Sequence, residues 1–414
     1  MRERAHIGRA ALLAVLLTLP AAGARADKQD FSQIERGRYL TIVGDCAACH
    51  TLTESGKAFA GGRPIETPFG NLLAPNITPD VETGIGAWSD DEFVNALTKG
   101  TGRHGTRLYP AMPYTYMTKT TREDALAIRA YLNTVPAVRN PVRTNQLPFP
   151  FNIRLGLAAW DWLYFSPGTF QPRAGKSEEW NRGAYLVEGL MHCGACHTPK
   201  NFAGGDHNGQ ALQGYALQGW FAPNITGDRR RGIGDWSIDD ITTYLKSGHN
   251  RSQAASGPMA EMVMDSSSKL TDADLHAIAV YLKDQAAGGG GEASNAPDQA
   301  LMKSGGQIFA DECAACHRQD AKGTPGMFPT LAGSPAVQST DPASLLRVVL
   351  RGARSAATDA APTGPAMPAF GWLLSDQEVA AVLTYIRNAW GNSAPPVSAG
   401  DVAKTRNDLS KRSD

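Results

Sequence analysis

The chain has 414 residues, of which 42% are apolar and 19% are charged, and its formal net charge is zero. This length is sufficient for two to four domains. The even balance of charges argues against a nucleic-acid-binding protein, which normally carries a basic excess. The composition also excludes disordered, collagen-like and polytopic membrane proteins.

The start of the chain predicts a cleaved export signal. Arginines at positions 2, 4 and 9 precede a short apolar run at 10–19, and Ala24-Arg25-Ala26 offers a cleavage site of small residues. Such a run is typical of a secretory signal peptide, here residues 1–26, and is too short for a lasting membrane span. An uncleaved anchor is the alternative. We therefore expect the mature protein to lie outside the cytoplasm.

All six cysteines belong to three copies of a Cys-x-x-Cys-His motif. Two thiols three residues apart lie on one helical turn and can add to the two vinyl groups of a haem, and the adjacent histidine can then bind the iron. Disulfides, a thioredoxin-like redox pair and zinc are the alternatives. Disulfides would not require a histidine after each pair. Three copies without a βαβ pattern argue against a redox pair, and zinc usually needs two such pairs close together or added histidines at finger spacing. The predicted haem-attaching residues and iron ligands are Cys46, Cys49 and His50, then Cys193, Cys196 and His197, then Cys313, Cys316 and His317.

A methionine in a proline-containing segment follows each motif. Met112 and Met367 both lie in Pro-Ala-Met-Pro, and Met259 follows Gly257-Pro258. Met112 and Met259 each lie 62 residues after the histidine of the preceding motif, and Met367 lies 50 residues after it. Because electron-carrying haems often pair histidine with methionine, we predict these three as the second iron ligands.

Other residues compete for that role. Met117 and Met264 share a separation of 67 residues from the preceding motif histidine. A methionine can also simply fill a gap in a core. His104 and His249 precede the favoured methionines in glycine-containing loops, so a haem with two histidine ligands is a further alternative.

Helical patterns enclose each motif. Glycine and an aromatic or apolar residue precede the motifs in Gly37-Arg-Tyr-Leu40, Gly183-Ala-Tyr-Leu186 and Gly306-Gln-Ile-Phe309. Apolar residues at helical spacing follow the methionines at 125–132, 275–282 and 379–386, with helix starts at Thr121, Thr271 and Ser375. We expect the glycine of each first helix to let the last helix cross it closely.

The first two units are near copies. Ala-Pro-Asn-Ile-Thr occurs at 74–78 and again at 222–226, and Gly-Ile-Gly-x-Trp occurs at 84–88 and again at 232–236. The constant offset indicates an internal duplication.

The expected fold is mainly α, with three tandem domains that each wrap one covalent haem. We place the domains at 27–134, 176–286 and 298–392, with a Pro- and aromatic-rich linker at 135–175 and a Gly-rich linker at 287–297. The aromatic linker either packs across two units or presents a surface to a partner or a membrane. Residues 393–414 are expected to form a loose, polar tail.

The segments around these motifs resemble the trihaem cytochrome c subunit of bacterial membrane-associated dehydrogenases for alcohols, gluconate, sorbitol and related sugars. The resemblance covers about residues 31–390 and is carried by 108–114 (LYPAMPY), 180–187 (WNRGAYLV), 192–199 (HCGACHTP) and 220–226 (WFAPNIT).

This resemblance implies three tandem cytochrome c domains and a large partner subunit with PQQ or flavin, optionally with a small third subunit. Electrons would pass through the three haems to ubiquinone, a terminal oxidase or another acceptor. The chain would associate peripherally with the periplasmic side of the inner membrane and carry no catalytic residues of its own. The alternatives are a peroxidase-like haem enzyme with an open iron position and a free-standing periplasmic electron shuttle.

Overall fold

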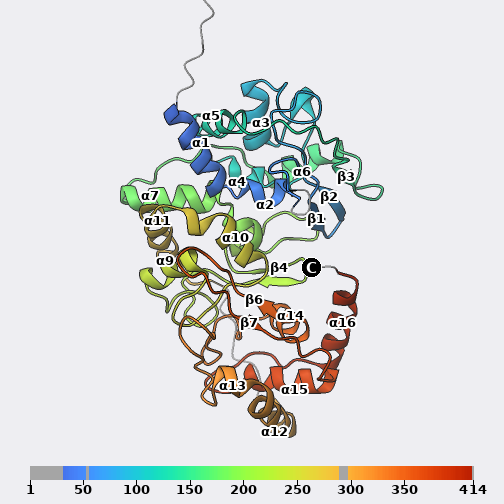
Figure 1. The fold of residues 1–414 in the computed structure, drawn as a ribbon, viewed down its shortest axis with the longest axis vertical. Coiled ribbons are helices and arrows are strands. Elements are labelled where there is room, and N and C mark those ends of the chain that lie inside the picture. Colours follow the sequence, from blue (N-terminus) through green and yellow to red (C-terminus); the bar gives the residue numbers. More distant parts are fainter. Residues whose placement is uncertain (1–30, 53–55, 289–296, 413–414) are drawn as a thin grey trace, which may run out of the picture.

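The computed structural model describes residues 31–52, 56–288 and 297–412. The predicted export signal and most of the Gly-rich linker lie outside these residues. The three units follow one another along the long axis of an elongated molecule, with the third at the opposite end from the first (Figure 1). Among the described residues, no helix is both long and apolar enough to cross a bilayer.

The first domain combines a helical frame with a small antiparallel sheet, in which β2 pairs with both β1 and β3. Its elements and those of the following segment are α1 (Phe31–Val43), α2 (Cys46–His50), β1 (Pro64–Thr67), β2 (Gly70–Leu73), α3 (Asp90–Lys99), α4 (Tyr114–Met117), α5 (Arg122–Leu132), β3 (Asn145–Gln146) and α6 (Gly156–Tyr164).

The second domain repeats this order with one antiparallel strand pair. Its elements are α7 (Glu178–Tyr185), a π-helical turn (Leu186–Leu190), α8 (Cys193–His197), β4 (Tyr215–Leu217), β5 (Trp220–Ala222), α9 (Ile238–Ser247), α10 (Pro258–Asp265) and α11 (Asp272–Lys283).

The third domain has a similar frame of helices around another short strand pair. Its elements are α12 (Gln299–Ile308), a π-helical turn (Phe309–Cys313), α13 (Ala314–His317), α14 (Ala343–Arg351), β6 (Ala353–Arg354), β7 (Ala366–Met367), α15 (Asp376–Ile386) and α16 (Ala399–Ser410). The mainly α fold with three tandem domains is thus confirmed.

The first helix of each domain crosses the helix that follows the predicted methionine ligand (α5, α11 or α15) at a glycine. A Cβ atom on Gly37 would lie 1.8 Å from the carbonyl oxygen of Ala127, and one on Gly183 would lie 2.0 Å from that of Ala277. The predicted close crossing is therefore confirmed. In the third domain the glycine at the crossing is Gly305, whose Cβ would lie 2.2 Å from the Ala381 carbonyl oxygen, and not Gly306, whose Cβ would lie 3.1 Å from the Tyr385 ring.

The predicted starts of the last helices are also confirmed. Thr121, Thr271 and Ser375 are the N-caps of α5, α11 and α15, and each side chain accepts a hydrogen bond from a backbone amide three residues later. Ser375 forms a full capping box with Glu378.

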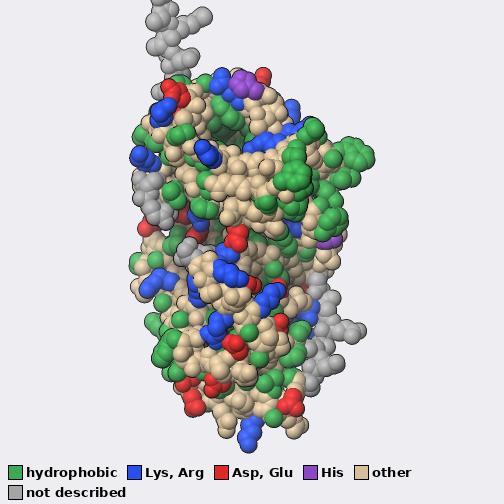
Figure 2. Space-filling model, turned by 90° about the vertical axis from the view of Figure 1, so that its right-hand side faces the viewer, with side chains coloured by type: hydrophobic (Ala, Val, Ile, Leu, Met, Phe, Trp, Pro, Cys, Tyr) green, Lys and Arg blue, Asp and Glu red, His purple; other side chains and the backbone are tan. Residues whose placement is uncertain are grey.

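Part of the aromatic segment after the first domain packs against the first two domains, and part of it is exposed to solvent. Asn145 and Gln146 extend the sheet of the first domain, and the Trp160 indole donates a 2.8 Å hydrogen bond to the Ala203 carbonyl of the second. Trp162, by contrast, is 83% exposed. Figure 2 looks at the side on which β3 lies in Figure 1 and shows hydrophobic side chains gathered over the first domain.

The end of the chain differs from the expected loose tail. Residues Ala399–Ser410 form α16, whose Val402 and Leu409 are buried in the core of the third domain. Arg406 pairs with Asp376 of α15 at 2.9 Å. One narrow apolar stripe is enough to hold a helix against an existing core. A mostly polar composition is therefore compatible with a packed helix in this segment.

Candidate haem sites

The three Cys-x-x-Cys-His motifs form short helical turns that follow the first helix of each domain. In α2, α8 and α13 the motif histidine is the last residue of the helix. None of the six cysteines is paired in a disulfide.

The first thiol of each motif lacks the acidity of a redox-active cysteine. Burial raises the pKa of Cys46 to about 12 and that of Cys313 to about 11, with neighbouring acidic groups adding to the effect. Burial likewise raises the pKa of Cys193 to about 12. A thioredoxin-like cysteine requires a lowered pKa, whereas thioether formation with a haem places uncharged sulfur in the same apolar surroundings. The donor set therefore fits covalent haem better than dithiol chemistry.

Each motif histidine hydrogen-bonds to a proline carbonyl through one ring nitrogen. The Nδ1 atoms of His50, His197 and His317 lie 2.8, 2.6 and 3.2 Å from proline carbonyl oxygens. Because a carbonyl only accepts, Nδ1 carries the proton and Nε2 keeps its lone pair. The acceptors are Pro75, Pro223 and Pro329, in that order.

These histidines are held in the form that binds iron. Burial lowers the pKa of all three, and the proline hydrogen bond opposes this effect in each case. A neutral imidazole oriented by a second hydrogen bond is the usual state of a metal-binding histidine. This arrangement fits a haem iron at each Nε2.

The proline carbonyls are functional groups that sequence reasoning missed. Pro75 and Pro223 lie in the repeated Ala-Pro-Asn-Ile-Thr segment. The sequence shows that this segment is repeated, but it does not show that the proline carbonyl meets the motif histidine. The asparagine of each copy fixes the loop: Asn76 donates to the Val138 carbonyl at 2.7 Å, and Asn224 donates to the Gly288 carbonyl at 2.6 Å. In the first two domains, the repeat therefore holds the proline carbonyl that accepts a hydrogen bond from the motif histidine.

The favoured methionines share one structural setting. Met112, Met259 and Met367 are all partly buried, and each packs on the hydrophobic cluster that also contacts the first cysteine of its own domain. Met117 is 3% exposed and belongs to the core itself. Met264 packs only on a small separate cluster, which Met259 contacts as well. This pattern favours the methionines named first, and the choice of second iron ligand stays a prediction.

The two competing histidines lie in different surroundings. His104 is exposed in a turn at Arg103–Gly105. His249 is 5% exposed, and its Nδ1 lies 3.0 Å from the Ser247 carbonyl oxygen.

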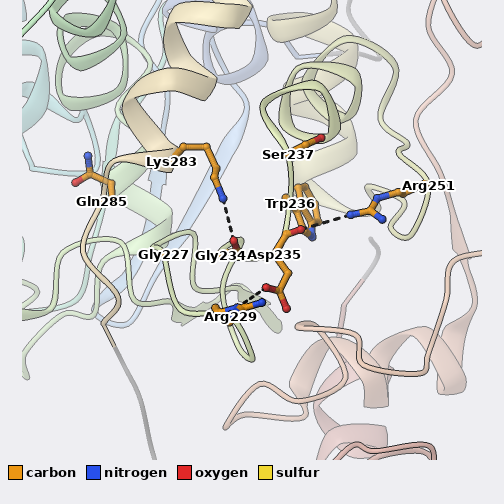
Figure 3. Close-up of a pocket in the computed structure, with 9 residues that line it drawn as sticks. All are labelled: Gly227, Arg229, Gly234, Asp235, Trp236, Ser237, Arg251, Lys283 and Gln285. Atoms are coloured by element: carbon orange, nitrogen blue, oxygen red, sulfur yellow. Dashed lines mark hydrogen bonds and ion pairs between the residues drawn. The ribbon is translucent and has the colours of Figure 1, made fainter.

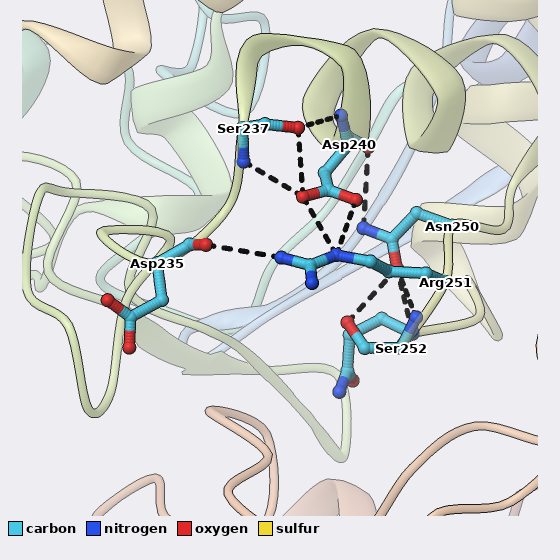
Figure 4. A network of polar contacts seen from close by, with 7 residues as sticks. Asp235, Ser237, Asp240, Asn250, Arg251 and Ser252 are labelled. Carbon is cyan, nitrogen blue, oxygen red and sulfur yellow. Dashed lines mark hydrogen bonds and ion pairs between the residues drawn. The ribbon is translucent and has the colours of Figure 1, made fainter.

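The loop that leads to Met259 is fixed by a polar network (Figure 4). The Arg251 guanidinium binds the Asp240 carboxylate at 2.9 and 3.1 Å, and Asn250 donates to the Asp240 carbonyl. Ser237 and Asp240 also form the capping box of α9. The loop continues to the third domain, where the Thr330 amide donates to the Ser252 carbonyl at 2.9 Å.

A shallow pocket of about 610 Å³ lies beside this network (Figure 3). None of the cysteines, histidines or methionines predicted to hold haem is among its described lining residues. Its cations already have partners: Arg229 pairs with Asp235 at 2.6 Å, and Lys283 donates to the Gly234 carbonyl at 2.9 Å. The pocket therefore contributes nothing to the haem sites.

The first two domains are joined by a reciprocal contact. Tyr39 of the first domain donates a 2.6 Å hydrogen bond to Asp274 of the second, and Tyr185 of the second donates a 2.6 Å hydrogen bond to Asp124 of the first. Such an exchange of equivalent bonds is what a two-fold relation between duplicated domains produces.

Tandem helical domains that each present a thiol pair and an oriented neutral histidine define a protein with several c-type haem domains. The cytochrome c family signature matches residues 34–136, 181–286 and 302–390, and the chain belongs to the cytochrome c family. Covalent haem c is the prosthetic group of this family's domains.

The chain is similar over most of its length to proteins of known description. It is 39% identical to the gluconate 2-dehydrogenase cytochrome c subunit of Pantoea cypripedii, covering 96% of this chain and 95% of that protein. It is 39% identical to the alcohol dehydrogenase (quinone) cytochrome c subunit of Gluconacetobacter polyoxogenes, with coverage of 92% and 86%. It is 37% identical to the fructose dehydrogenase cytochrome subunit of Gluconobacter japonicus, with coverage of 90% and 82%.

Proposed function

We propose that this chain binds three covalent haems and relays electrons from a partner dehydrogenase subunit to a respiratory acceptor. The observation that carries the proposal is the threefold recurrence of a histidine whose Nδ1 bonds to a proline carbonyl behind a Cys-x-x-Cys pair. When bound, each haem supplies a one-electron couple. The residues of the chain attach the haem, orient the histidine and exclude water; none of them acts on a substrate.

The names of the relatives support the proposed partner. They are cytochrome subunits of gluconate, alcohol and fructose dehydrogenases. We propose a large subunit with PQQ or flavin as the electron donor, optionally with a small third subunit. Ubiquinone or a terminal oxidase is the proposed acceptor. The proposed location is the periplasmic side of the inner membrane, after removal of residues 1–26.

Haem stoichiometry tests the first part of this proposal. The chain is produced with its export signal in a host that matures c-type cytochromes, and haem and iron are measured per polypeptide. We expect three of each. Replacing both cysteines of one motif by alanine, as in Cys313→Ala with Cys316→Ala, should remove one third of the covalent haem. A wild-type value below three would contradict the proposal.

The second iron ligand is tested by spectroscopy of the oxidised protein. Met112→Ala should remove the near-infrared band of methionine bound to ferric haem from one haem in three. Met117→Ala, the matched control, should leave that band intact. The reverse result would assign Met117 instead. A high-spin, five-coordinate signal in the wild type would favour the haem-enzyme alternative.

The electron-transfer role is tested in the intact complex. A tagged chain is purified from membranes of its native host, and gluconate, ethanol and fructose are each added anaerobically while the reduced haem bands are followed. We expect a large subunit to co-purify and one of these substrates to reduce the haems. Purification without a large subunit, from an otherwise active membrane, would favour the free shuttle.

Exposed apolar side chains support the proposed membrane association. Phe149, Leu155 and Trp162 are 78%, 80% and 83% exposed and lie within one short segment. The charged residues of that segment are engaged elsewhere: Asp161 accepts a 2.6 Å hydrogen bond from the Tyr114 hydroxyl, and the Arg154 guanidinium lies over the Tyr109 ring. The segment thus presents apolar groups with little charge between them.

Liposome flotation tests this part. Wild-type protein should float with vesicles of phosphatidylethanolamine and phosphatidylglycerol, and a Trp162→Ser, Leu155→Ser variant should float less. Trp372 in the third domain is similarly exposed, at 82%. Trp372→Ser is therefore the control, with no expected effect. Equal flotation of all three proteins would rule out this segment as the membrane contact.

A further inference from the structure

Asp45 lies at the junction between the first two Cys-x-x-Cys-His motifs. It directly precedes Cys46, its backbone is left-handed (φ 50°, ψ 35°), and its Oδ1 is enclosed without a hydrogen-bond partner. Besides burial, which is the larger cause, its negative charge raises the pKa of Cys46 and Cys49 in its own motif and of Cys196 in the second motif. A carboxylate that acts on thiols of both motifs lies between the two haem attachment points.

The backbones of the two motifs also meet closely at this point. A Cβ atom on Gly44 would lie 3.2 Å from Leu190 Cδ1, and the ring of His192 hydrogen-bonds to the Gly44 backbone. His192 directly precedes the second motif, as Asp45 precedes the first. Burial lowers the pKa of His192 against the effect of its hydrogen bonds, so its imidazole is neutral and brings no charge to Asp45.

The charged groups that face Asp45 do not neutralise it. Glu261 and Asp265 on α10 bring like charge, and Arg63 and Lys269 bring opposite charge. Arg63 is bound to the Glu261 carboxylate at 2.6 Å, and the Lys269 ammonium donates to the Asp265 carbonyl at 3.2 Å. Burial first, and then Asp265 and Glu261, raise the pKa of Asp45 to about 8 against the effect of the two cations.

We propose that Asp45 couples proton uptake to reduction of the first two haems and thereby makes their reduction potentials depend on pH. The proposal rests on the proposed function, because it requires haem at both motifs. An ionised carboxylate beside a haem stabilises ferric over ferrous iron, since it offsets the extra positive charge.

Proton uptake accompanies reduction of the haems, and proton release accompanies their oxidation. When the donor subunit delivers one electron and ferric iron becomes ferrous, the loss of positive charge favours transfer of one proton from solvent to the half-buried Asp45 carboxylate. When the acceptor removes the electron, the proton returns to solvent. Because two haems share the carboxyl group, the uptake divides between them and is at most one proton for the pair.

Spectroelectrochemical titration of the mature holoprotein between pH 6 and pH 9.5 tests the proposal. In the wild type, the potentials of two haems should fall as pH rises. In Asp45→Asn, which keeps the volume and tolerates a left-handed backbone, both potentials should be higher than the wild-type values at pH 9.5 and nearly independent of pH. A variant that lacks the cysteines of the third motif should retain only the signals of the first two haems, and its spectra therefore assign the two potentials.

Glu312 provides the matched control. It occupies the equivalent position before Cys313 but is exposed to water. Glu312→Gln should leave the pH dependence of all three potentials unchanged, because solvent screens a charge at this exposed position.

Proton uptake by the wild type supplies a second measurement that needs no variant to fold. On anaerobic reduction in weakly buffered solution at pH 8, an indicator dye should report protons taken up, and Asp45→Asn should take up fewer. Wild-type potentials that are flat with pH, or a slope retained in Asp45→Asn, would overturn the proposal. A wild-type chain with fewer than three haems would instead overturn the proposed function.

Discussion

Asp274 is a single residue that links the first two domains. Its carboxylate accepts two 2.8 Å hydrogen bonds from Arg182 of its own domain and one of 2.6 Å from Tyr39 of the first domain. Burial opposes ionisation of Asp274, but the hydrogen bonds from Arg182 and Tyr39 outweigh it, so its pKa lies below its ordinary value. The charge of this residue therefore contributes to folding stability.

Asp274→Asn should lower the free energy of unfolding by about 2–3 kcal/mol at neutral pH, because it removes charge-assisted bonds and leaves Arg182 without its counterion. Since the folded pKa is depressed, the contribution is full above about pH 4 and is lost as pH falls through the folded pKa. Urea unfolding should show a shallower acid decline for the variant. Asp272→Asn on the same helix, where the side chain is 89% exposed, should change little. Equal stability of the Asp274 variant and wild type at pH 7 would contradict this account.

Residue patterns predicted the local roles of these side chains better than their distant contacts. Thr271 was predicted as a helix start, and it is the N-cap of α11. The Asp274 carboxylate, however, accepts a hydrogen bond from Tyr39, and the Thr271 amide donates to the Tyr39 hydroxyl instead of to Asp274. No local pattern encodes which domains face each other, so this contact could not be predicted. The same holds for Pro75, whose carbonyl becomes a partner of a motif histidine only after the chain folds back.

At the level of elements, the crossing of α7 and α11 requires glycine. Gly183→Ala would place Cβ 2.0 Å from the Ala277 carbonyl oxygen and 2.8 Å from Tyr281 Cβ, and both neighbours are helix backbone or its first side-chain atom. The helices must separate, so we expect a loss of about 1–3 kcal/mol in urea unfolding. Gly209→Ala, with no atom within 4 Å of the new Cβ, is the control. An unchanged urea midpoint for Gly183→Ala would show that the crossing can relax.

The helix α16 shows where composition misleads. It was expected to be a loose tail because most of its residues are polar, yet Leu409 is 3% exposed and Val402 is fully buried. A helix held by so few apolar residues has no strong period in the sequence, and its packing partner is a core formed elsewhere. The helices beside the motifs were predictable because their caps and glycines recur in each unit.

Leu409→Ala should therefore destabilise the third domain by about 2 kcal/mol or more, because it removes buried apolar volume that the surroundings cannot refill. Lys404→Ala on the exposed face of α16 should have almost no effect. Guanidinium unfolding followed by the haem absorbance of the third domain is the measurement. If both variants unfold at the wild-type midpoint, α16 does not support the core.

At the scale of the whole molecule, the hydrophobic clusters divide the three domains into two bodies. One hydrophobic cluster runs through the first and second domains, and a second cluster fills the third domain together with α16. Between the two bodies lie a small cluster of alanines and valine and polar contacts such as that of Gln253 with Ser334 at 2.9 Å. A shared apolar core couples unfolding strongly, whereas a polar interface of small residues couples it weakly.

Calorimetry of the holoprotein should therefore show two transitions. Gly183→Ala lies in the body formed by the first two domains and should lower the temperature of one transition alone. Leu409→Ala lies in the third domain and should lower the other. Because each variant serves as the control for the other, the result does not depend on assigning the transitions in advance. A single transition moved by both variants would mean that haem binding and the polar interface join the whole chain into one unit. Separate movement would mean that the third domain can unfold without disturbing the body formed by the first two domains.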